Sequence, residues 1–521
     1  MSASTSSSPT PKNKTFSPKD AEVEERKGLL IDADENLDDH DEYFEDDIPT
    51  TRSSWSRRKI TTTAIVIIGL LVTGALARTV LFGSPGRMTN HSAFSGEELR
   101  SNGTALFKRT VVVVSIDGLR ADYLDRGFTP HLLALSKKGL RAKSMKPIFP
   151  TLTFPNHWAI MTGLHAESHG IVANNFWDPV TGEEFHYNQI KSAWISSWWF
   201  GEPMWETAEK AGVTAANLMW PGPPKTTSGS SATYFVPWKD KVPLEDKLKQ
   251  ILNWIDLPLD KRPQLILAYE PSLDQAGHAT GPYSERVNHT LVQVDVFAKE
   301  LHDSIAARNL TDIVDIVFVS DHGMTDTSNP EPVYMDDILG KEGIAAIAHE
   351  DGWPSMGLRF HEHANLSKHL DALLKASDNN PEKFDVYTHE TMPERYHFAN
   401  NERIAPIYVV PKIGYILTTH AEGNTGMSKG NHGYDNEEVS MQAMFVAHGP
   451  FSHQAKAQHQ RRSKIAHLSS RAHEGWHSTS DDTYIMNTFQ NVEIYNLVMK
   501  LLGIENIANN NGTLGFWDQY L

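Results

Sequence analysis

Three short apolar runs stand out in the pattern of hydrophobic and polar positions, at Val111–Ile116, Gln264–Tyr269 and Ile313–Val319. Near-continuous apolar runs of this length are typical of parallel strands whose two faces are both covered. Amphipathic stretches at Leu244–Ile255 and Val292–Ala307 are candidate covering helices. The pattern therefore predicts an α/β fold, with a mostly parallel sheet between layers of helices.

The C-terminal part of the chain continues this pattern. Apolar runs at Ile407–Leu417 and Met441–Ala447 predict further strands, and Val492–Leu502 predicts a closing helix. Residues 455–483 are rich in His, Arg and Ser, and we expect a surface insertion loop there, with metal binding by its histidines as an alternative. No internal repeat is present in residues 108–521.

Residues 1–56 have the composition of a disordered, acidic tail. Residues 1–50 alone carry 14 Asp and Glu against 5 Lys and Arg, so about half of the net charge of −17 lies there. Such a segment has too little apolar surface to fold. Glu25, followed by Leu29 and Leu30, has the form of an acidic-dileucine sorting signal, which predicts binding to sorting adaptors unless the match is a chance one.

An apolar segment at 57–82 follows the tail. Its 18 uncharged residues from Ile60 to Ala77 make a helix of roughly 27 Å, near the thickness of a bilayer core. An Arg-Arg-Lys cluster precedes them, which favours a cytosolic N-terminus, and a cleaved signal peptide would begin nearer the start of the chain. We expect a transmembrane signal-anchor and a single-pass type II membrane protein, rather than a buried core helix.

Residues 83–107 are expected to form a Gly/Ser/Asn linker. Glycosylation signals of the form Asn-X-Ser/Thr then occur at Asn90, Asn102, Asn288, Asn309, Asn365 and Asn511. They fit a lumenal or extracellular C-terminal part, in the vacuole, the Golgi or at the cell surface, although each signal alone is weak.

Composition excludes some kinds of site. The chain has no cysteine, so disulfides and thiolate metal ligands are excluded. Outside the acidic tail the sequence is mildly acidic and carries no basic stripe, so no stable complex with nucleic acid is expected.

The segment from Pro147 to Pro179 reads as a loop that becomes a short helix. Pro155 suits the first helical position and Gly163 a C-terminal stop. Thr153 is then expected just before the helix N-terminus, where unpaired N–H groups favour negative charge. The Thr153 hydroxyl is either a nucleophile, if another group withdraws its proton, or simply the helix cap.

Each of the three apolar runs is followed closely by a carboxylate, at Asp117, Asp274 and Asp321. In open α/β sheets ligands bind beyond the carboxyl ends of the strands, so these three side chains are expected to converge. Taken singly, each one also fits a turn or a helix cap.

Histidines accompany these carboxylates, since His278 lies four residues after Asp274, His322 follows Asp321, and His432 lies in Lys-Gly-Asn-His-Gly-Tyr-Asp. Oxygen and imidazole ligands without sulfur suit zinc, with manganese less favoured. Three carboxylates and three histidines are too many for one tetrahedral ion with an open position. They suit two ions about 4 Å apart, an arrangement that clamps the attacking and leaving oxygens of a phosphoryl displacement.

Five segments carry a family resemblance: Ile-Asp-Gly-Leu-Arg-Ala-Asp-Tyr-Leu (116–124), Thr-Phe-Pro-Asn-His (153–157), Thr-Gly-Leu-His-Ala-Glu-Ser-His-Gly-Ile (162–171), Ser-Asp-His-Gly-Met (320–324) and Asn-His-Gly-Tyr-Asp-Asn (431–436). They closely resemble the nucleotide pyrophosphatase/phosphodiesterase family of the alkaline phosphatase superfamily, in a compact form without cysteine-rich modules. The resemblance covers residue 108 to the C-terminus. It implies a phosphodiesterase catalytic domain, an alkaline-phosphatase-like α/β/α sandwich and two zinc ions.

The resemblance also implies a division of the ligands between the ions. One ion takes Asp274, His278 and His432. The other takes Asp117, Asp321, His322 and the hydroxyl of Thr153. Coordination to a divalent cation makes an alkoxide accessible near neutral pH, which agrees with Thr153 as the nucleophile of a covalent nucleotidyl-threonine intermediate.

Substrate-binding residues are implied in the same way. Asn174 matches the family residue that donates its amide to a phosphoryl oxygen, although a structural turn residue is the alternative. Phe154 and Trp238 resemble the pair that stacks on the nucleobase, with Trp238 replacing the usual Tyr. Leu152 stands where some animal members have Lys, so one phosphate contact is missing.

The expected function is hydrolysis of pyrophosphate and phosphodiester bonds in nucleotides such as nucleoside triphosphates and dinucleotides, giving nucleoside 5′-monophosphates. The alternative enzyme is a lysophospholipid or choline-phosphate diesterase on the same two-zinc core. A silent lumenal binding or sorting protein is the alternative outside catalysis, and loss of a metal ligand would indicate it. A sulfatase is disfavoured because no cysteine is present to become formylglycine.

Overall fold

The computed structural model describes residues 98–423, 428–466, 476–478 and 484–521. Within these ranges, no helix is long and apolar enough to cross a membrane. The expected acidic tail, the sorting signal at Glu25, Leu29 and Leu30, the anchor at 57–82 and the glycosylation signal at Asn90 all lie outside the described residues.

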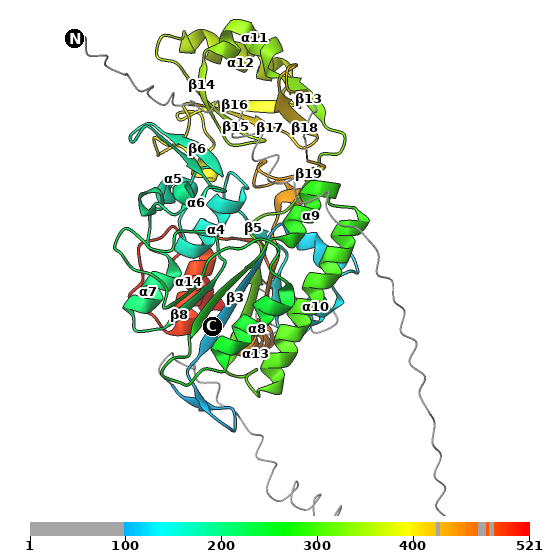
Figure 1. The fold of residues 1–521 in the computed structure, drawn as a ribbon. Coiled ribbons are helices and arrows are strands. Elements are labelled where there is room, and N and C mark those ends of the chain that lie inside the picture. The colour runs from blue at the N-terminus through cyan, green and yellow to red at the C-terminus, as the bar shows by residue number, and fades with distance from the viewer. Residues whose placement is uncertain (1–97, 424–427, 467–475, 479–483) are drawn as a thin grey trace, which may run out of the picture. The chain divides into compact units, whose positions relative to one another are not determined.

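A nine-stranded sheet forms the centre of the main domain (Figure 1). From edge to edge its strands are β21 (Trp476–Ser478), β22 (Tyr484–Met486), β4 (Leu140–Ala142), β20 (Phe445–His448), β11 (Val314–Val319), β3 (Thr110–Ile116), β10 (Leu265–Glu270), β8 (Ala215–Leu218) and β9 (Tyr234–Val236). The five strands from β11 to β9 are parallel, whereas β20 is antiparallel to β11. The three strands predicted from apolar runs are thus confirmed within one residue at each end.

Side chains from these strands are buried on both faces of the sheet. Val317, Val113 and Leu267 lie opposite one another in register on β11, β3 and β10, and none of them is exposed to solvent. They belong to a core that also contains buried residues of α4 (Thr153–Thr162), α7 (Met204–Lys210) and α14 (Glu493–Leu502). This double burial is why the strands read as continuous apolar runs.

The other face is covered by α3 (Pro130–Lys138), α8 (Leu244–Ile255) and α10 (Glu285–Ala307), which pack against one another and against β4, β10 and β20 (Figure 1). The helix predicted at Leu244–Ile255 is confirmed. The order of helix, sheet and helix is the predicted α/β/α sandwich.

A second, smaller sheet lies within residues 331–418, which we call the inserted module. Its antiparallel strands run in the order β14 (Ile347–Asp351), β15 (Met356–Phe360), β17 (Ile407–Pro411) and β16 (Phe384–Thr388). Helices α11 (Met335–Ala345) and α12 (Leu366–Asn379) pack on it, and β13 (Glu331–Tyr334) pairs with β18 (Tyr415–Thr418). The module has a hydrophobic core of its own.

The inserted module adds a second sheet to the predicted sandwich. The run Ile407–Leu417 does form strands, but they are β17 and β18, and neither joins the nine-stranded sheet. Residues 412–414 separate them, with Gly414 at a φ of 93°, a backbone conformation that favours glycine. An apolar run shows that a strand forms, but not which sheet it joins.

The surface loop expected at 455–483 is also corrected. Helix α13 (Pro450–Ala466) occupies its first part, and β21 forms an edge of the large sheet. Pro450 suits a first helical position, and the following Gln, Ala, Lys and Arg residues are good helix formers. A polar composition indicated exposure to solvent and did not argue against a helix.

The C-terminal part of the expected linker at 83–107 lies within the described residues. There β1 (Arg100–Ser101) pairs with β2 (Leu106–Phe107) in a short antiparallel ribbon. Asn102 stabilises the turn between them, because its Oδ1 accepts hydrogen bonds from the backbone nitrogens of Thr104 and Ala105.

Candidate metal and catalytic site

Three buried carboxylates meet at the carboxyl edge of the large sheet, as predicted. Asp117 directly follows β3, and Asp321 is the second residue after β11. Asp274 lies in the first turn of α9 (Ser272–Thr280), just after β10. Because β10, β3 and β11 are adjacent and parallel, the segments after them emerge side by side. The side chains of all three are at most 9% exposed.

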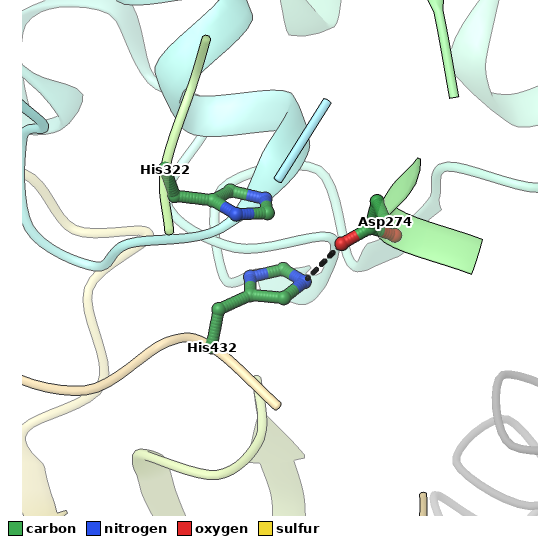
Figure 2. A group of neighbouring side chains, drawn as sticks. All are labelled: Asp274, His322 and His432. Carbon is green, nitrogen blue, oxygen red and sulfur yellow. Dashed lines mark ion pairs between the residues drawn. The ribbon is translucent and has the colours of Figure 1, made fainter. Parts of the chain in front are cut away.

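Asp274, His278 and His432 form the first cluster. The Nε2 atoms of His278 and His432 are 3.0 Å apart, and they lie 3.4 and 3.5 Å from the two oxygens of Asp274. Figure 2 shows Asp274 facing His432, whose ring stacks against that of His322 at 3.5 Å between centroids. The structure thus brings together the three residues expected to hold one ion.

Thr153, Asp117, Asp321 and His322 form the second cluster. His322 Nε2 lies 3.0 Å from Asp321 Oδ2, 3.4 Å from Asp117 Oδ1 and 3.1 Å from Thr153 Oγ1. Ligands of a tetrahedral zinc ion with bonds of 2.0–2.1 Å are about 3.3 Å apart, so the spacings in both clusters fit such an ion. His322 also lies within reach of Asp274 and His432, so the two clusters are adjacent.

The hydrogen bonding leaves the atoms that face these clusters without partners. Asp117 Oδ1, Asp274 Oδ1 and Asp321 Oδ2 are buried and accept no hydrogen bond within the described residues. A buried acceptor without a partner is costly, and a cation satisfies it. These orphaned oxygens are the observation in the structure that fits bound metal.

The orientation of the histidine rings also fits metal binding. Nδ1 of His278, His322 and His432 lies 2.8–2.9 Å from the carbonyl oxygens of Gly430, Gly323 and Thr151, respectively. A ring that donates its Nδ1 proton to a carbonyl leaves the Nε2 lone pair for a metal ion. In all three rings Nε2 is the atom that faces the cluster.

Burial and like charges shift the protonation of the site. Burial raises the pKa of Asp117 well above its usual value, and the neighbouring Asp321 and Asp274 raise it further. Burial also lowers the pKa of His432, with further contributions from His322 and His278, which keeps this imidazole in its neutral, ligating form. Three carboxylates lie together in this buried site, and divalent cations would compensate their charge.

Thr153 is the first residue of α4, with Leu152 as the N-cap. Gly163 ends the helix in a left-handed conformation with a φ of 70°, as predicted. Pro155 is the third helical residue rather than the first, because Thr153 and Phe154 already have helical conformation. The hydroxyl of Thr153 thus lies in the first turn of the helix, where the helix dipole favours negative charge.

Two buried residues support the second cluster although the sequence predicted no role for them. His157, one turn after Thr153, places its Nδ1 2.9 Å from the Thr153 carbonyl oxygen and 3.3 Å from Asp321 Oδ2. The hydroxyl of Tyr269 donates a hydrogen bond to Asp117 Oδ2. The only indication of this role in the sequence was that His157 lies one helical turn after Thr153.

Asn174 lies beside Thr153, the predicted nucleophile. Its Oδ1 accepts a hydrogen bond from the backbone nitrogen of Phe154 at 3.1 Å, while its amide nitrogen donates none within the described residues. This hydrogen bond connects Asn174 to the first turn of α4. The predicted contact of Asn174 with a phosphoryl oxygen stays a prediction.

Phe154 is in contact with other aromatic rings. The centroids of Tyr187, Trp199 and Phe185 lie 5.2, 6.1 and 6.3 Å from that of Phe154. No local sequence pattern indicated a role for Tyr187 and Trp199, because only the tertiary fold brings them to Phe154.

Trp238 follows β9 by one residue and is 50% exposed. Because β9 is parallel to β8, Trp238 lies at the same carboxyl edge as the predicted metal ligands. No ring contact joins Trp238 to Phe154 in the described structure. A base held between two rings keeps them about 7 Å apart, so the stacking pair stays a prediction.

Five of the six predicted glycosylation signals lie in the described residues, and Asn309, Asn365 and Asn511 are exposed. The amide nitrogens of Asn102 and Asn309 donate to backbone carbonyls, so a glycan there would replace a hydrogen bond. Asn365 is the N-cap of α12 and uses only its oxygen. Glycosylation stays a prediction at all of these positions.

Comparison with known proteins gives a consistent result. Residues 111–435 match the family described as type I phosphodiesterase / nucleotide pyrophosphatase. An uncharacterized pyrophosphatase/phosphodiesterase of Schizosaccharomyces pombe is 36% identical, over 88% of this chain and 89% of its own length. Ectonucleotide pyrophosphatase/phosphodiesterase family member 3 of Mus musculus is 33% identical, over 78% of this chain and 43% of its own length. The chain thus matches less than half of this animal relative.

Solved structures resemble the described fold. Murine ectonucleotide pyrophosphatase/phosphodiesterase 5, as an inactive threonine-to-alanine variant in complex with AMP, is 28% identical with a TM-score of 0.66, covering 80% of this chain and 100% of that one. The human protein of the same name gives 28% identity and a TM-score of 0.67 over the same shares. This chain therefore belongs to the type I phosphodiesterase / nucleotide pyrophosphatase family of enzymes.

Proposed function

We propose that this protein hydrolyses pyrophosphate and phosphodiester bonds of nucleotides and releases nucleoside 5′-monophosphates through a covalent nucleotidyl-threonine at Thr153. The observation that carries the proposal is the position of Thr153 Oγ1, 3.1 Å from His322 Nε2 and beside the orphaned oxygens of Asp117 and Asp321. A hydroxyl in such a cluster is an activated nucleophile, whereas a plain helix cap would bind the N–H groups of its own helix.

Two zinc ions are the proposed cofactors. Asp274, His278 and His432 would hold one ion, and Asp117, Asp321, His322 and Thr153 the other. When bound, such ions act as Lewis acids that lower the pKa of a coordinated hydroxyl or water and neutralise phosphoryl charge. The donor set contains only nitrogen and oxygen, which suits zinc.

The residues of the chain then have separate roles in an in-line displacement. The Oγ1–phosphorus bond to Thr153 forms while the bond to the leaving group breaks, and water later attacks the same phosphorus and restores the Thr153 hydroxyl. The free amide nitrogen of Asn174 donates to a nonbridging phosphoryl oxygen as charge develops on it. His157 holds the carbonyl of Thr153, which keeps the first turn of α4 in place.

Aromatic rings favour a nucleotide over a lipid as the substrate. Phe154, with Tyr187 and Trp199 around it, offers one stacking face, and Trp238 on the same sheet edge offers a second. Base stacking is tolerant of sequence because every base has a π face. The AMP bound by the murine relative supports this choice for a protein of the same family. A lysophospholipid or choline-phosphate diesterase is the second candidate, because an acyl chain would also lie on aromatic walls.

A substrate panel on the full chain tests the proposal. The p-nitrophenyl ester of thymidine 5′-monophosphate, ATP and a dinucleotide should be hydrolysed much faster than lysophosphatidylcholine or p-nitrophenyl phosphate. Preference for the lysolipid would replace the nucleotide proposal, and preference for the monoester would exclude a diesterase. No hydrolysis of any substrate by zinc-loaded protein would favour a silent binding protein, although all seven expected ligands are present.

The membrane arrangement is a separate proposal. The apolar segment at 57–82 and the basic cluster before it support a single-pass type II topology with the catalytic domain lumenal or extracellular. In that arrangement Glu25, Leu29 and Leu30 would face cytosolic sorting adaptors. Protease protection of residues 98–521 in sealed membranes is expected, and digestion there would contradict the topology.

A further inference from the structure

A β-hairpin connects the substrate site to the inserted module. Strands β6 (Asn175–Asp178) and β7 (Glu183–His186) form this two-stranded sheet. Asn174 immediately precedes the hairpin and Tyr187 immediately follows it, and the Tyr187 nitrogen donates to the Asn174 carbonyl oxygen at 3.1 Å. The open end of the hairpin therefore carries both a phosphoryl-binding candidate, Asn174, and a ring that packs against Phe154, Tyr187.

The inserted module holds the same hairpin through β14, which lies beside β6 (Figure 1). The backbone nitrogen of Trp177 donates to Asp351 Oδ1 at 2.8 Å. The Trp177 ring stacks on His349, with centroids 3.9 Å apart and an interplanar angle of 10°. Trp177 lies in β6, while His349 and Asp351 lie in β14.

Asp351 is itself firmly held. Its side chain is 2% exposed, and its Oδ2 accepts a hydrogen bond from Arg359 Nε at 3.1 Å. Arg359 also donates to the carbonyl oxygen of Arg403, and the Arg403 guanidinium pairs with buried Asp178 of the hairpin. Contacts from Asp351, directly and through Arg359 and Arg403, therefore extend to both Trp177 and Asp178 of the hairpin.

Strand alternation separates two kinds of contact along β6. Phe176 is fully buried in the core of the main domain, where its ring stacks on Phe185. Trp177, the next residue, points to the opposite face, towards the module. A two-stranded hairpin is at best marginally stable on its own, so contacts on both faces determine its position.

We propose that Asp351 is a positioning residue for nucleotide recognition: it fixes Trp177 and thereby sets the position of Tyr187 and Asn174 at the substrate site. This inference rests on the proposed function. It assigns the inserted module a role in specificity, although none of the seven expected metal ligands lies in it.

Two variants and a control test the proposal. Asp351→Ala removes both hydrogen bonds, whereas Asp351→Asn keeps an oxygen that can accept from the Trp177 nitrogen. The control is Asp385→Ala, which breaks contacts to Lys412 and Tyr387 within the module and none to the hairpin. The substrates are the p-nitrophenyl ester of thymidine 5′-monophosphate and bis(p-nitrophenyl) phosphate, which has no nucleobase.

For Asp351→Ala we expect the KM of the nucleotide ester to rise about fivefold, the size expected for the loss of one ordinary hydrogen bond. The KM of the aryl diester should rise less, by about twofold, because its phosphoryl group still contacts Asn174 but it has no base for Tyr187 to contact. Asp351→Asn should recover most of the loss, and Asp385→Ala should show none. Equal losses on both substrates, or an unchanged nucleotide KM, would overturn the proposal.

Hydrogen–deuterium exchange of the full chain gives a readout that does not depend on activity. Peptides covering 174–187 should exchange faster in Asp351→Ala than in the wild type and in Asp385→Ala. Unchanged exchange there would overturn the proposal even if activity changed. If the wild type fails to hydrolyse the nucleotide ester, the proposed function fails, while the exchange result still decides whether Asp351 holds the hairpin.

Discussion

Replacing Thr153 removes the proposed nucleophile and little else. The side chain is 8% exposed, and its hydroxyl has one hydrogen-bond partner in the structure, His322 Nε2 at 3.1 Å. Valine is nearly isosteric with threonine, so Thr153→Val should cost about 1 kcal/mol of stability, the size of one hydrogen bond. Thr153→Ser keeps the hydroxyl and is the matched control.

The expected catalytic loss is much larger than the loss of stability. Removing the nucleophile of a covalent mechanism lowers kcat by about 10⁴- to 10⁶-fold, which is roughly 5–8 kcal/mol of activation free energy. Asp117, Asp321 and His322 remain in the variant, and three protein ligands suffice for a catalytic zinc site. Thr153→Val should therefore keep its metal and lose its activity.

The assay is stopped-flow hydrolysis of the p-nitrophenyl nucleotide ester, with zinc content and melting temperature measured on the same samples. Denatured wild-type protein quenched during turnover should carry a nucleotidyl group on the peptide that contains Thr153. Thr153→Val should carry none, and Thr153→Ser should retain both label and activity. Turnover by Thr153→Val within about tenfold of the wild type would refute the nucleophile assignment.

Three further predictions concern base stacking on Phe154, removal of the metal ions and the dependence of stability on pH. Phe154→Ala should raise the KM of nucleotide esters about tenfold, since stacking on a base is worth roughly 1–3 kcal/mol, and an equal effect on bis(p-nitrophenyl) phosphate would contradict a base-stacking role. Dialysis against EDTA should abolish activity and lower the melting temperature, because buried carboxylates lose their cations, and zinc should restore both; full activity in EDTA would count against a metalloenzyme. Burial raises the pKa of Asp351 from 3.8 to about 7. Between pH 3.8 and about 7 the Asp351 carboxyl is therefore protonated in the folded state and ionised in the unfolded state. The free energy of unfolding falls as pH rises through that range. Asp351→Asn cannot ionise, so its melting temperature relative to the wild type should rise from about pH 5 to about pH 8, and a difference independent of pH would refute the pKa argument.

Much of the main domain could be predicted because its signals are local. A strand buried on both faces is mostly apolar, and β3 and β11 have that pattern, although β11 contains the buried Asp315, which pairs with Arg109. The convergence of the three carboxylates then followed from the geometry of parallel strands.

Other features depend on contacts between distant residues. Asp351 and Trp177 are 174 positions apart, and nothing in either local pattern indicates their hydrogen bond. Tyr187 and Trp199 reach Phe154 only through the packing of the hairpin and its neighbours. The sheet that β17 joins depends likewise on its partners β15 and β16. Periodicity alone carries none of this information.

Metal content measured by mass spectrometry on the full, folded chain tests the central claim most directly. The account predicts about two zinc ions per chain in the wild type and about one in His278→Asn, which lacks one ligand of the first cluster. The matched control, His420→Asn, alters an exposed histidine that stacks on Tyr334 and should keep both ions. A wild-type value of one or none, or two ions retained in His278→Asn, would contradict the paired-metal site.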